Sequence, residues 1–229
     1  MIIRQLFDPE TSTYSYLLAD ETTREALLID PVIEQLERDL RLLDELGCKL
    51  LYSLDTHVHA DHITASGSLR NQTGCQTALS HHAGVGCADI ALKEGDSLSL
   101  GNSEIRVMET PGHTPTCLCF VAGNHVFTGD SLLIRGCGRT DFQQGNAGNL
   151  YDAITQRLFT LPDDTLVRPG HDYHGMLVST IAEEKKFNPR LKLDKAAFIQ
   201  FMANLNLPSP NKIHEALPAN LACGEKQES

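Results

Sequence analysis

Four potential metal ligands follow one another within six residues of this chain, directly after a stretch that reads as a buried strand. Residues 49–55 (KLLYSLD) are mostly apolar, and the segment THVHADH that comes next contains His57, His59, Asp61 and His62. Imidazole nitrogens and carboxylate oxygens are common ligands of transition metals. This close spacing cannot bring all four side chains to one metal with good geometry. It suits two adjacent metal positions, or one metal whose ligands are oriented by the remaining side chains.

Three more potential ligands occupy turns that follow predicted strands. His113 lies in TPGHTP, Asp130 in FTGDS and His171 in PGHD, and an apolar stretch precedes each turn. Proteins of the α/β class place their sites where strands end. We therefore expect these turns and the His-rich loop to form one metal site.

Strands and helices alternate along the chain, which predicts an α/β protein whose helices cover its sheets. A polar turn at 20–23 between two apolar stretches predicts a hairpin. Asp30 is expected to cap a helix that begins at Pro31 and ends at Gly47. Further helices are predicted at residues 149–161, 175–187 and 194–205, whereas residues 208–229 carry little pattern.

Composition and charge limit which partners and which cellular location we expect for this chain. The net charge of the 229 residues is −11, and nucleic acids bind mainly through Lys and Arg, so we expect no nucleic-acid partner. No apolar run approaches the roughly 18 residues of a membrane span, and the N-terminus lacks the pattern of a signal peptide. We therefore expect no membrane partner and a cytoplasmic location, with a processed mitochondrial protein as the alternative. The seven cysteines, an odd number, are expected to be reduced thiols.

The order His-x-His-x-Asp-His, Gly-His-Thr, Gly-Asp and Gly-His resembles the metallo-β-lactamase superfamily over roughly residues 10–180. The resemblance implies an αβ/βα sandwich of two mixed sheets flanked by helices, with the metal site at one edge. We expect residues 1–229 to form a single domain of this kind, in which about 180–229 is a C-terminal helical extension.

Other segments resemble one family of this superfamily, the persulfide dioxygenases, also called sulfur dioxygenases or ethylmalonic encephalopathy proteins. These segments are LLIRGCGRTDFQQG at 132–145, GHDYHG at 170–175, NPRL at 188–191, NLNLP at 204–208 and PAN at 218–220. The likeness covers nearly the whole chain. Glyoxalase II shares the GCGR segment, but there aromatic residues follow the arginine, where this chain has Thr140 and Asp141, and a longer helical domain ends that protein.

The resemblance to persulfide dioxygenases implies one Fe(II) per chain, held by His57, His113 and Asp130. This 2-His-1-carboxylate set leaves three positions open for substrate and O2. The implied reaction oxidises glutathione persulfide with O2 and water to sulfite and glutathione. In this interpretation four residues surround and orient the ligands, whereas in a dinuclear relative they would bind a second metal: His59, Asp61, His62 and His171.

Three residues are candidates for substrate binding or catalytic support. Arg139 could meet a glutathione carboxylate or the aspartates of the site, or it could pin its own loop with Asp141 as its partner. Tyr173 could place its phenol near the open metal positions, or it could be a buried structural residue. Both alternatives stay open for each side chain at this point.

Two other functions compete with the dioxygenase hypothesis. One is a Zn-dependent hydrolase of glutathione thioesters like glyoxalase II, which would use both metal positions to make the attacking hydroxide. The other is a non-catalytic module that binds sulfur compounds or metal. A homodimer is the expected assembly.

Overall fold

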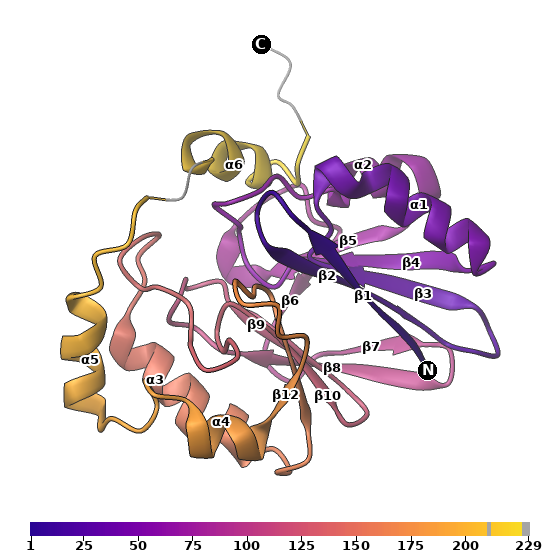
Figure 1. Cartoon of the computed structure of the whole chain (residues 1–229). Coiled ribbons are helices and arrows are strands. Elements are labelled where there is room, and N and C mark those ends of the chain that lie inside the picture. The colour runs from indigo at the N-terminus through magenta and orange to yellow at the C-terminus, as the bar shows by residue number, and fades with distance from the viewer. Residues whose placement is uncertain (210–211, 226–229) are drawn as a thin grey trace.

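The computed structural model describes residues 1–209 and 212–225, which form two six-stranded sheets with helices on their outer faces (Figure 1). The strands of the first sheet lie side by side in chain order: β1 (Ile2–Asp8), β2 (Thr13–Ala19), β3 (Glu25–Ile29), β4 (Lys49–Leu54), β5 (Gln76–Ser80) and β6 (Ile90–Leu92). The second sheet has the order β12 (Ser179–Thr180), β11 (Leu166–Pro169), β10 (His125–Gly129), β9 (Leu118–Ala122), β8 (Ser103–Glu109) and β7 (Ser97–Leu100). Both sheets mix parallel and antiparallel pairs, so the predicted αβ/βα sandwich is confirmed.

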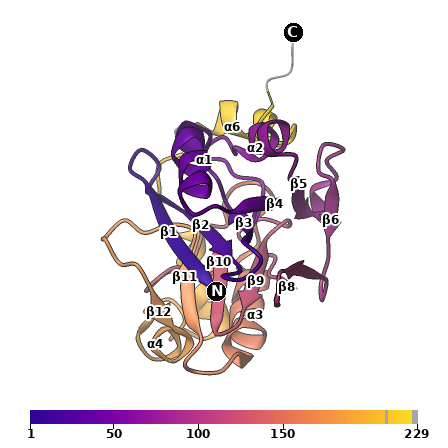
Figure 2. The same ribbon diagram turned by 90° about the vertical axis from the view of Figure 1, so that its right-hand side faces the viewer.

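Helices cover both outer faces of this sandwich. The first sheet carries α1 (Leu36–Glu45), preceded by a short 3-10 turn at Ile33–Gln35, and α2 (Ser66–Thr73). The second sheet carries α3 (Ala147–Gln156), α4 (Ile181–Phe187) and α5 (Lys195–Ala203). The last helix, α6 (Ile213–Asn220), lies beside α2 in both ribbon views (Figures 1 and 2).

Strand β2 buries both of its faces because its side chains alternate between two apolar layers. In β2, Tyr16 and Leu18 join the cluster between the sheets, whereas Leu17 and Ala19 join the cluster under α1 and α2. A third cluster lies between the second sheet and α3–α5. The predicted site residues lie beyond the ends of the strands.

The chain direction brings those strand ends to one edge of the sandwich. Strands β3, β4 and β5 are parallel, so the loop after β4 leaves at the same edge as its neighbours. In the second sheet β8, β10 and β11 share one direction, because β9 is antiparallel to β8 and β10. A backbone hydrogen bond of 2.7 Å from Leu118 to Thr56 joins the two sheets at this edge.

Two secondary-structure predictions are wrong, and one helix lies where the sequence shows little pattern. Asp30 caps no helix: its φ is 50°, and its carboxylate turns toward the His-rich loop, while helical structure begins only at Ile33. The predicted helix at 175–187 begins at Ile181, because Thr180 accepts a hydrogen bond from the Glu183 amide and caps it there. Helix α6 was not predicted, since Pro218 inside it interrupts the usual helical pattern.

The structure also shows which cysteines are paired. Cys87 and Cys223 form a disulfide, so the prediction that all cysteines are reduced thiols is wrong for this pair, and the other five are free.

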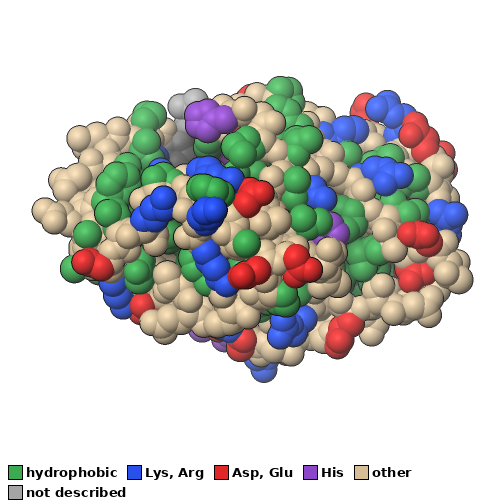
Figure 3. Space-filling view, turned by 60° about the horizontal axis from the view of Figure 1, so that its bottom comes forward, with side chains coloured by type: hydrophobic (Ala, Val, Ile, Leu, Met, Phe, Trp, Pro, Cys, Tyr) green, Lys and Arg blue, Asp and Glu red, His purple; other side chains and the backbone are tan. Residues whose placement is uncertain are grey.

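None of the helices in residues 1–209 and 212–225 has the length and apolar composition that a membrane span requires. On the face in Figure 3, Lys and Arg side chains gather near the centre among apolar and acidic ones.

Candidate metal centre

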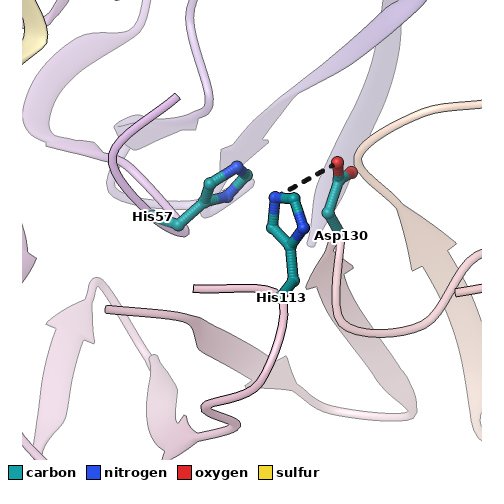
Figure 4. A group of neighbouring side chains, drawn as sticks. All are labelled: His57, His113 and Asp130. Atoms are coloured by element: carbon teal, nitrogen blue, oxygen red, sulfur yellow. Dashed lines mark ion pairs between the residues drawn. The ribbon is translucent and has the colours of Figure 1, made fainter. Parts of the chain in front are cut away.

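His57, His113 and Asp130 point toward one another from three different loops (Figure 4). His57 follows β4, His113 follows β8 and Asp130 follows β10. One nitrogen or oxygen of each lies within 4.8 Å of the others. The Nε2 of His113 is 3.8 Å from the Oδ2 of Asp130, and the two imidazole rings are nearly perpendicular, with centroids 4.9 Å apart.

Hydrogen bonds fix the tautomers of both histidines. The Thr56 hydroxyl donates its proton to Asp30, at 2.8 Å, so it accepts the bond of 3.0 Å that joins it to Nδ1 of His57. The Nδ1 of His113 lies 2.6 Å from the carbonyl oxygen of Arg139, which can only accept. Each Nδ1 therefore carries the proton, and each Nε2 presents a lone pair to the space beside Asp130.

The electrostatics of the site favour the protonation states in which His57 and Asp130 can bind a metal ion. Burial, together with His59 and His113, holds the pKa of His57 well below its usual value, so this imidazole is neutral. Burial alone would raise the pKa of Asp130, but nearby His171, with His113 and His57, lowers it, so the carboxylate is ionised. Two imidazoles and one carboxylate are the donor set of non-haem Fe(II) sites.

His171 lies between two carboxylates. Its Nδ1 is 2.6 Å from Oδ1 of Asp130, and its Nε2 is 3.0 Å from Oδ2 of Asp61. Burial alone would lower the pKa of His171, but these two aspartates raise it well above its usual value. The resulting imidazolium occupies Oδ1 of Asp130 and leaves Oδ2 directed at His113.

His59, Asp61 and His62 form a second group of potential ligands beside the first. His59 is turned toward Asp30, with Nε2 at 3.1 Å from Oδ1, and Asp61 accepts from His62 at 2.9 Å. Burial opposes the charged form of His59, yet Asp30, which also bonds to it, and Asp61 raise its pKa to about 9. Within the described residues Nδ1 of His59 and Nε2 of His62 are buried without a hydrogen-bond partner. One nitrogen of His59 and one of His62 are therefore free to bind a metal ion. The carboxylate of Asp61, however, already accepts hydrogen bonds from His62 and His171.

A pocket of about 700 Å³ opens onto the metal centre. This size is usual for a site that binds a small molecule. Its lining includes His113, Asp130 and His171, the loop at 133–139, Tyr173, and part of the segment before α6.

The loop at 133–139 is held close to the metal ligands. The amide of Gly138 donates to the carbonyl of Asp130 at 2.7 Å. A Cβ on Gly138 would lie 2.3 Å from that carbonyl oxygen and 2.9 Å from the His113 ring, so only glycine fits here. At the other end of the loop, the buried Glu184 carboxylate accepts bonds from the backbone and the guanidinium of Arg135.

Four cationic side chains line the pocket, and most of them are paired. Arg139 binds both oxygens of Asp141 at 2.7 Å and also donates to the carbonyls of Leu207 and Pro208, which favours the loop-pinning alternative. Arg135 pairs with Glu183 and Glu184, and Lys212 pairs with Glu10 and Glu34. Within the described residues the side-chain hydrogen bonds of Arg190 involve Nη1 alone, at the carbonyl and sulfur of Cys137, so the other N–H groups of the guanidinium are available.

Every predicted site residue lies at this edge of the molecule. Tyr173 stacks on His171 with the centroids 6.0 Å apart and is 67% exposed, so the buried structural alternative is wrong. Sequence reasoning missed Asp30, Thr56 and Arg190. Asp30 ends an apolar strand, as the predicted ligands do, and this signal could have identified it.

A separate cluster lies outside the pocket. His81 and His82 approach one oxygen of Glu109 to 3.4 and 3.6 Å, so these two histidines have a common carboxylate partner that their sequence positions did not reveal. Both imidazoles are more than one third exposed. Ion pairing at an exposed position accounts for this arrangement.

Comparisons with known proteins agree with this geometry. Residues 8–171 match the family model of the metallo-beta-lactamase superfamily. Over 227 residues the chain is 52% identical to the mitochondrial persulfide dioxygenase ETHE1 of Homo sapiens, which covers 98% of this chain and 89% of the human protein. The crystal structure of ETHE1 from Myxococcus xanthus is 54% identical, covers 98% of this chain and 100% of that chain, and has a TM-score of 0.96. A hydroxyacylglutathione hydrolase of Polaromonas is 35% identical over 178 residues, which cover 75% of this chain and 66% of the hydrolase.

Proposed function

The chain belongs to the metallo-beta-lactamase superfamily and, within it, to the persulfide dioxygenase family, and from this membership we propose that it oxidises glutathione persulfide with O2. One persulfide, one O2 and one water give one glutathione and one sulfite with two protons, so atoms and charge balance. We propose that one Fe(II) per chain is held by His57, His113 and Asp130.

The observation that carries this proposal is the direction of the three donor atoms. Two Nε2 lone pairs, each fixed by a proton on Nδ1, face the same space as Oδ2 of Asp130. A set of two imidazoles and one carboxylate leaves several positions of Fe(II) open. When bound, the iron would bring the persulfide sulfur and O2 together and pass electrons between them.

The rest of the site supports one metal in preference to two. Asp30 holds Nε2 of His59 in a hydrogen bond of 3.1 Å, so this nitrogen is not available to a second metal. Asp61 is shared between His62 and His171. A second ion would have to break these bonds, so in this proposal the four residues orient the ligands of the first metal.

The substrate would enter the pocket beside the metal centre. Glutathione carries two carboxylates, and a guanidinium binds a carboxylate in a bidentate manner. We assign this contact to Arg190, whose available N–H groups line the pocket, while Arg139 and Asp141 support the loop beside it. Tyr173, exposed at the pocket and stacked on His171, would cover the bound persulfide.

The test is to load the protein with Fe(II) without oxygen, add glutathione persulfide, and measure O2 uptake and sulfite. We expect one sulfite per O2 in the wild type and none in His57→Ala. The control is His82→Ala, since this side chain is half exposed and lies outside the pocket. An iron-replete wild type that takes up no O2, or a zinc-loaded one that hydrolyses a glutathione thioester, would favour the hydrolase instead.

The similarity to the Polaromonas hydrolase supports the competing hypothesis of a thioester hydrolase. The identity to that hydrolase is 35%, however, whereas the identity to the human dioxygenase is 52%. The cytoplasmic location stays a prediction, since the human relative is named as mitochondrial. The homodimer also stays a prediction. Cell fractionation and sedimentation would test these two points.

A further inference from the structure

Asn220, at the end of α6, binds the backbone of the His-rich loop. Its Nδ2 donates to the carbonyl oxygens of His59 and His62, at 2.9 and 2.8 Å. Its Oδ1 accepts from the amide of Thr64, at 2.9 Å. The side chain is 4% exposed, and both of its donors and its acceptor are used. We call residues 57–64 the metal loop.

The two halves of the metal loop are supported from different sides. The second sheet holds the first half, because the Thr116 hydroxyl accepts from the Val58 amide and the Leu118 amide donates to Thr56. Asn220, more than 150 positions away in sequence, holds the second half together with the Ile33 amide, which donates to the Ile63 carbonyl. Without Asn220, two carbonyls and one amide in a buried loop would lose their partners, which is costly.

The segment after Asn220 is fastened to α2. The carbonyl of Cys223 accepts from the Gly67 amide at 2.9 Å, and Glu225 pairs with Arg70 at 2.9 Å. Arg70 also donates to the carbonyl of Cys87, at 2.6 Å. The Cys87–Cys223 disulfide joins the same C-terminal segment covalently to the loop before β6, which contains Cys87. Helix α6 lies beside α2 in both ribbon views (Figures 1 and 2).

The contact between α2 and the C-terminal segment is close enough to require glycine. A Cβ on Gly67 would lie 2.7 Å from the Cys223 carbonyl oxygen and 2.7 Å from Cγ of Glu225. An alanine at Gly67 would therefore push the segment away while leaving Asn220 and both cysteines intact.

We propose that Asn220 is a positioning residue of the metal centre, and that the Cys87–Cys223 disulfide is a redox-dependent clasp that keeps Asn220 on the metal loop. The inference rests on the proposed metal centre but not on its reaction. When the disulfide is intact, the segment after α6 stays tethered to the loop before β6, next to α2. When it is reduced, only the noncovalent contacts hold α6, so local opening becomes more frequent.

Reduction is a thiol–disulfide exchange. Two thiols of the glutathione class give the protein two electrons and two protons, the S–S bond between Cys87 and Cys223 breaks, and one disulfide of the donor forms. A donor disulfide reverses the step. Glutathione is a product of the proposed reaction, so a reductant of this class is present where the enzyme works. Cys223 is buried but Cys87 is only partly so, and attack is expected at the sulfur of Cys87.

The first test compares the rate at which Fe(II) passes from the protein to a ferrous chelator without oxygen. Asn220 touches no ligand itself but holds the loop that begins at His57, so Asn220→Ala should release iron faster, by no more than about the tenfold at the lower end of what loss of a direct outer partner costs. Asn220→Asp keeps the acceptor for Thr64 but loses both donors, and it should also release iron faster. The control is Leu43→Ala, a core truncation under α1 that destabilises the fold but should release iron at the wild-type rate.

Two further readouts separate positioning from general stability. The EPR spectrum of the nitric oxide adduct of the Fe(II) protein should change in Asn220→Ala and not in Leu43→Ala. Hydrogen exchange at amides 59–64 should speed up in metal-free Asn220→Ala. Wild-type release rates and exchange in both Asn220 variants would overturn the positioning role. If Asn220→Ala does not fold, Gly67→Ala provides the same test.

The clasp is tested by measuring iron release from the wild type in two states. One sample is oxidised, and the other is reduced and then separated from the reductant. Reduced protein should release iron faster than oxidised protein, and Cys87→Ser should match the reduced rate in both treatments. Equal rates in the two states, or no Cys87–Cys223 disulfide in protein isolated without reductant, would overturn the clasp. A wild type that binds no iron would overturn the proposed metal centre, while hydrogen exchange in the metal-free protein would still decide the role of Asn220.

Discussion

Replacing Thr56 by valine should weaken the metal centre while preserving the shape of the side chain. The hydroxyl connects two buried groups, since it donates to Asp30 at 2.8 Å and accepts from Nδ1 of His57 at 3.0 Å. Thr56→Val leaves both partners without this bond in a buried place. His57 then loses the contact that keeps its proton on Nδ1 and its lone pair on Nε2.

The expected magnitudes follow from these two contacts. An unsatisfied buried polar group costs about 1–3 kcal/mol, so the metal-free variant should lose about 2–4 kcal/mol in its free energy of unfolding. Loss of an outer partner of a metal ligand typically weakens binding by about 10–100-fold, which corresponds to about 1.4–2.7 kcal/mol. Fe(II) affinity is measured by competition with a chelating dye without oxygen, and stability by urea unfolding of the metal-free protein.

The matched control is Thr77→Val. Thr77 is a buried threonine in β5 whose hydroxyl donates to the carboxylate of Asp89 at 3.0 Å, and neither residue contacts a proposed ligand. It should lose stability but keep the wild-type affinity for iron. If Thr56→Val bound Fe(II) as tightly as the wild type despite losing stability, the tautomer argument for His57 would be refuted.

Three other predictions concern the surroundings of the site and the link between the sheets. Gly138→Ala should weaken iron binding by at least about tenfold in the same dye competition, because its Cβ would displace Asp130. Glu184→Gln should lower the free energy of unfolding by about 2–4 kcal/mol in urea, because the ion pair with Arg135 loses a buried partner. Asp20→Ala should be less stable than the wild type at pH 6, and this difference should shrink as the pH falls from 5 toward 2. Backbone N–H groups, with the Thr23 amide foremost, lower the pKa of Asp20 to about 2, below the unfolded value of about 3.9, so its stabilisation is present above the unfolded pKa and lost through the folded one.

Each of these predictions has its own control. Gly136→Ala should bind iron normally, since the nearest atom to its Cβ would be 3.8 Å away; equal affinity in both glycine variants would contradict the close-approach argument. An unchanged unfolding curve for Glu184→Gln would show that its ion pair does not hold the loop. A stability difference for Asp20→Ala that stays constant down to pH 2 would contradict the role of the ionised carboxylate.

Much of the fold and of the candidate site could be predicted because the signals are local. The metal loop, His113, Asp130 and His171 each follow an apolar strand, and strands that share one direction place such residues at one edge. The two-sheet architecture came with the resemblance to the family. The organisation of residues 1–229 as one domain with a helical extension stays a prediction.

The remaining features depend on contacts that no local pattern encodes. Beside Pro31, Asp30 has the sequence pattern of a helix cap. In the structure it instead forms hydrogen bonds with Thr56 and His59, more than 25 positions later. Helix α6 contains a proline and buries little apolar surface of its own, so periodicity misses it. The Cys87–Cys223 pairing spans 136 positions and depends on how the segment after α6 packs against the loop before β6.

The central claim is that one iron is held by His57, His113 and Asp130, beside a second set of potential ligands that holds none. The most direct measurement is an anomalous difference map from crystals of the Fe(II)-loaded protein, recorded above the iron absorption edge. The account predicts one peak per chain, between the Nε2 atoms of His57 and His113 and Oδ2 of Asp130. A second peak among His59, Asp61 and His62, or a single peak located there, would contradict it.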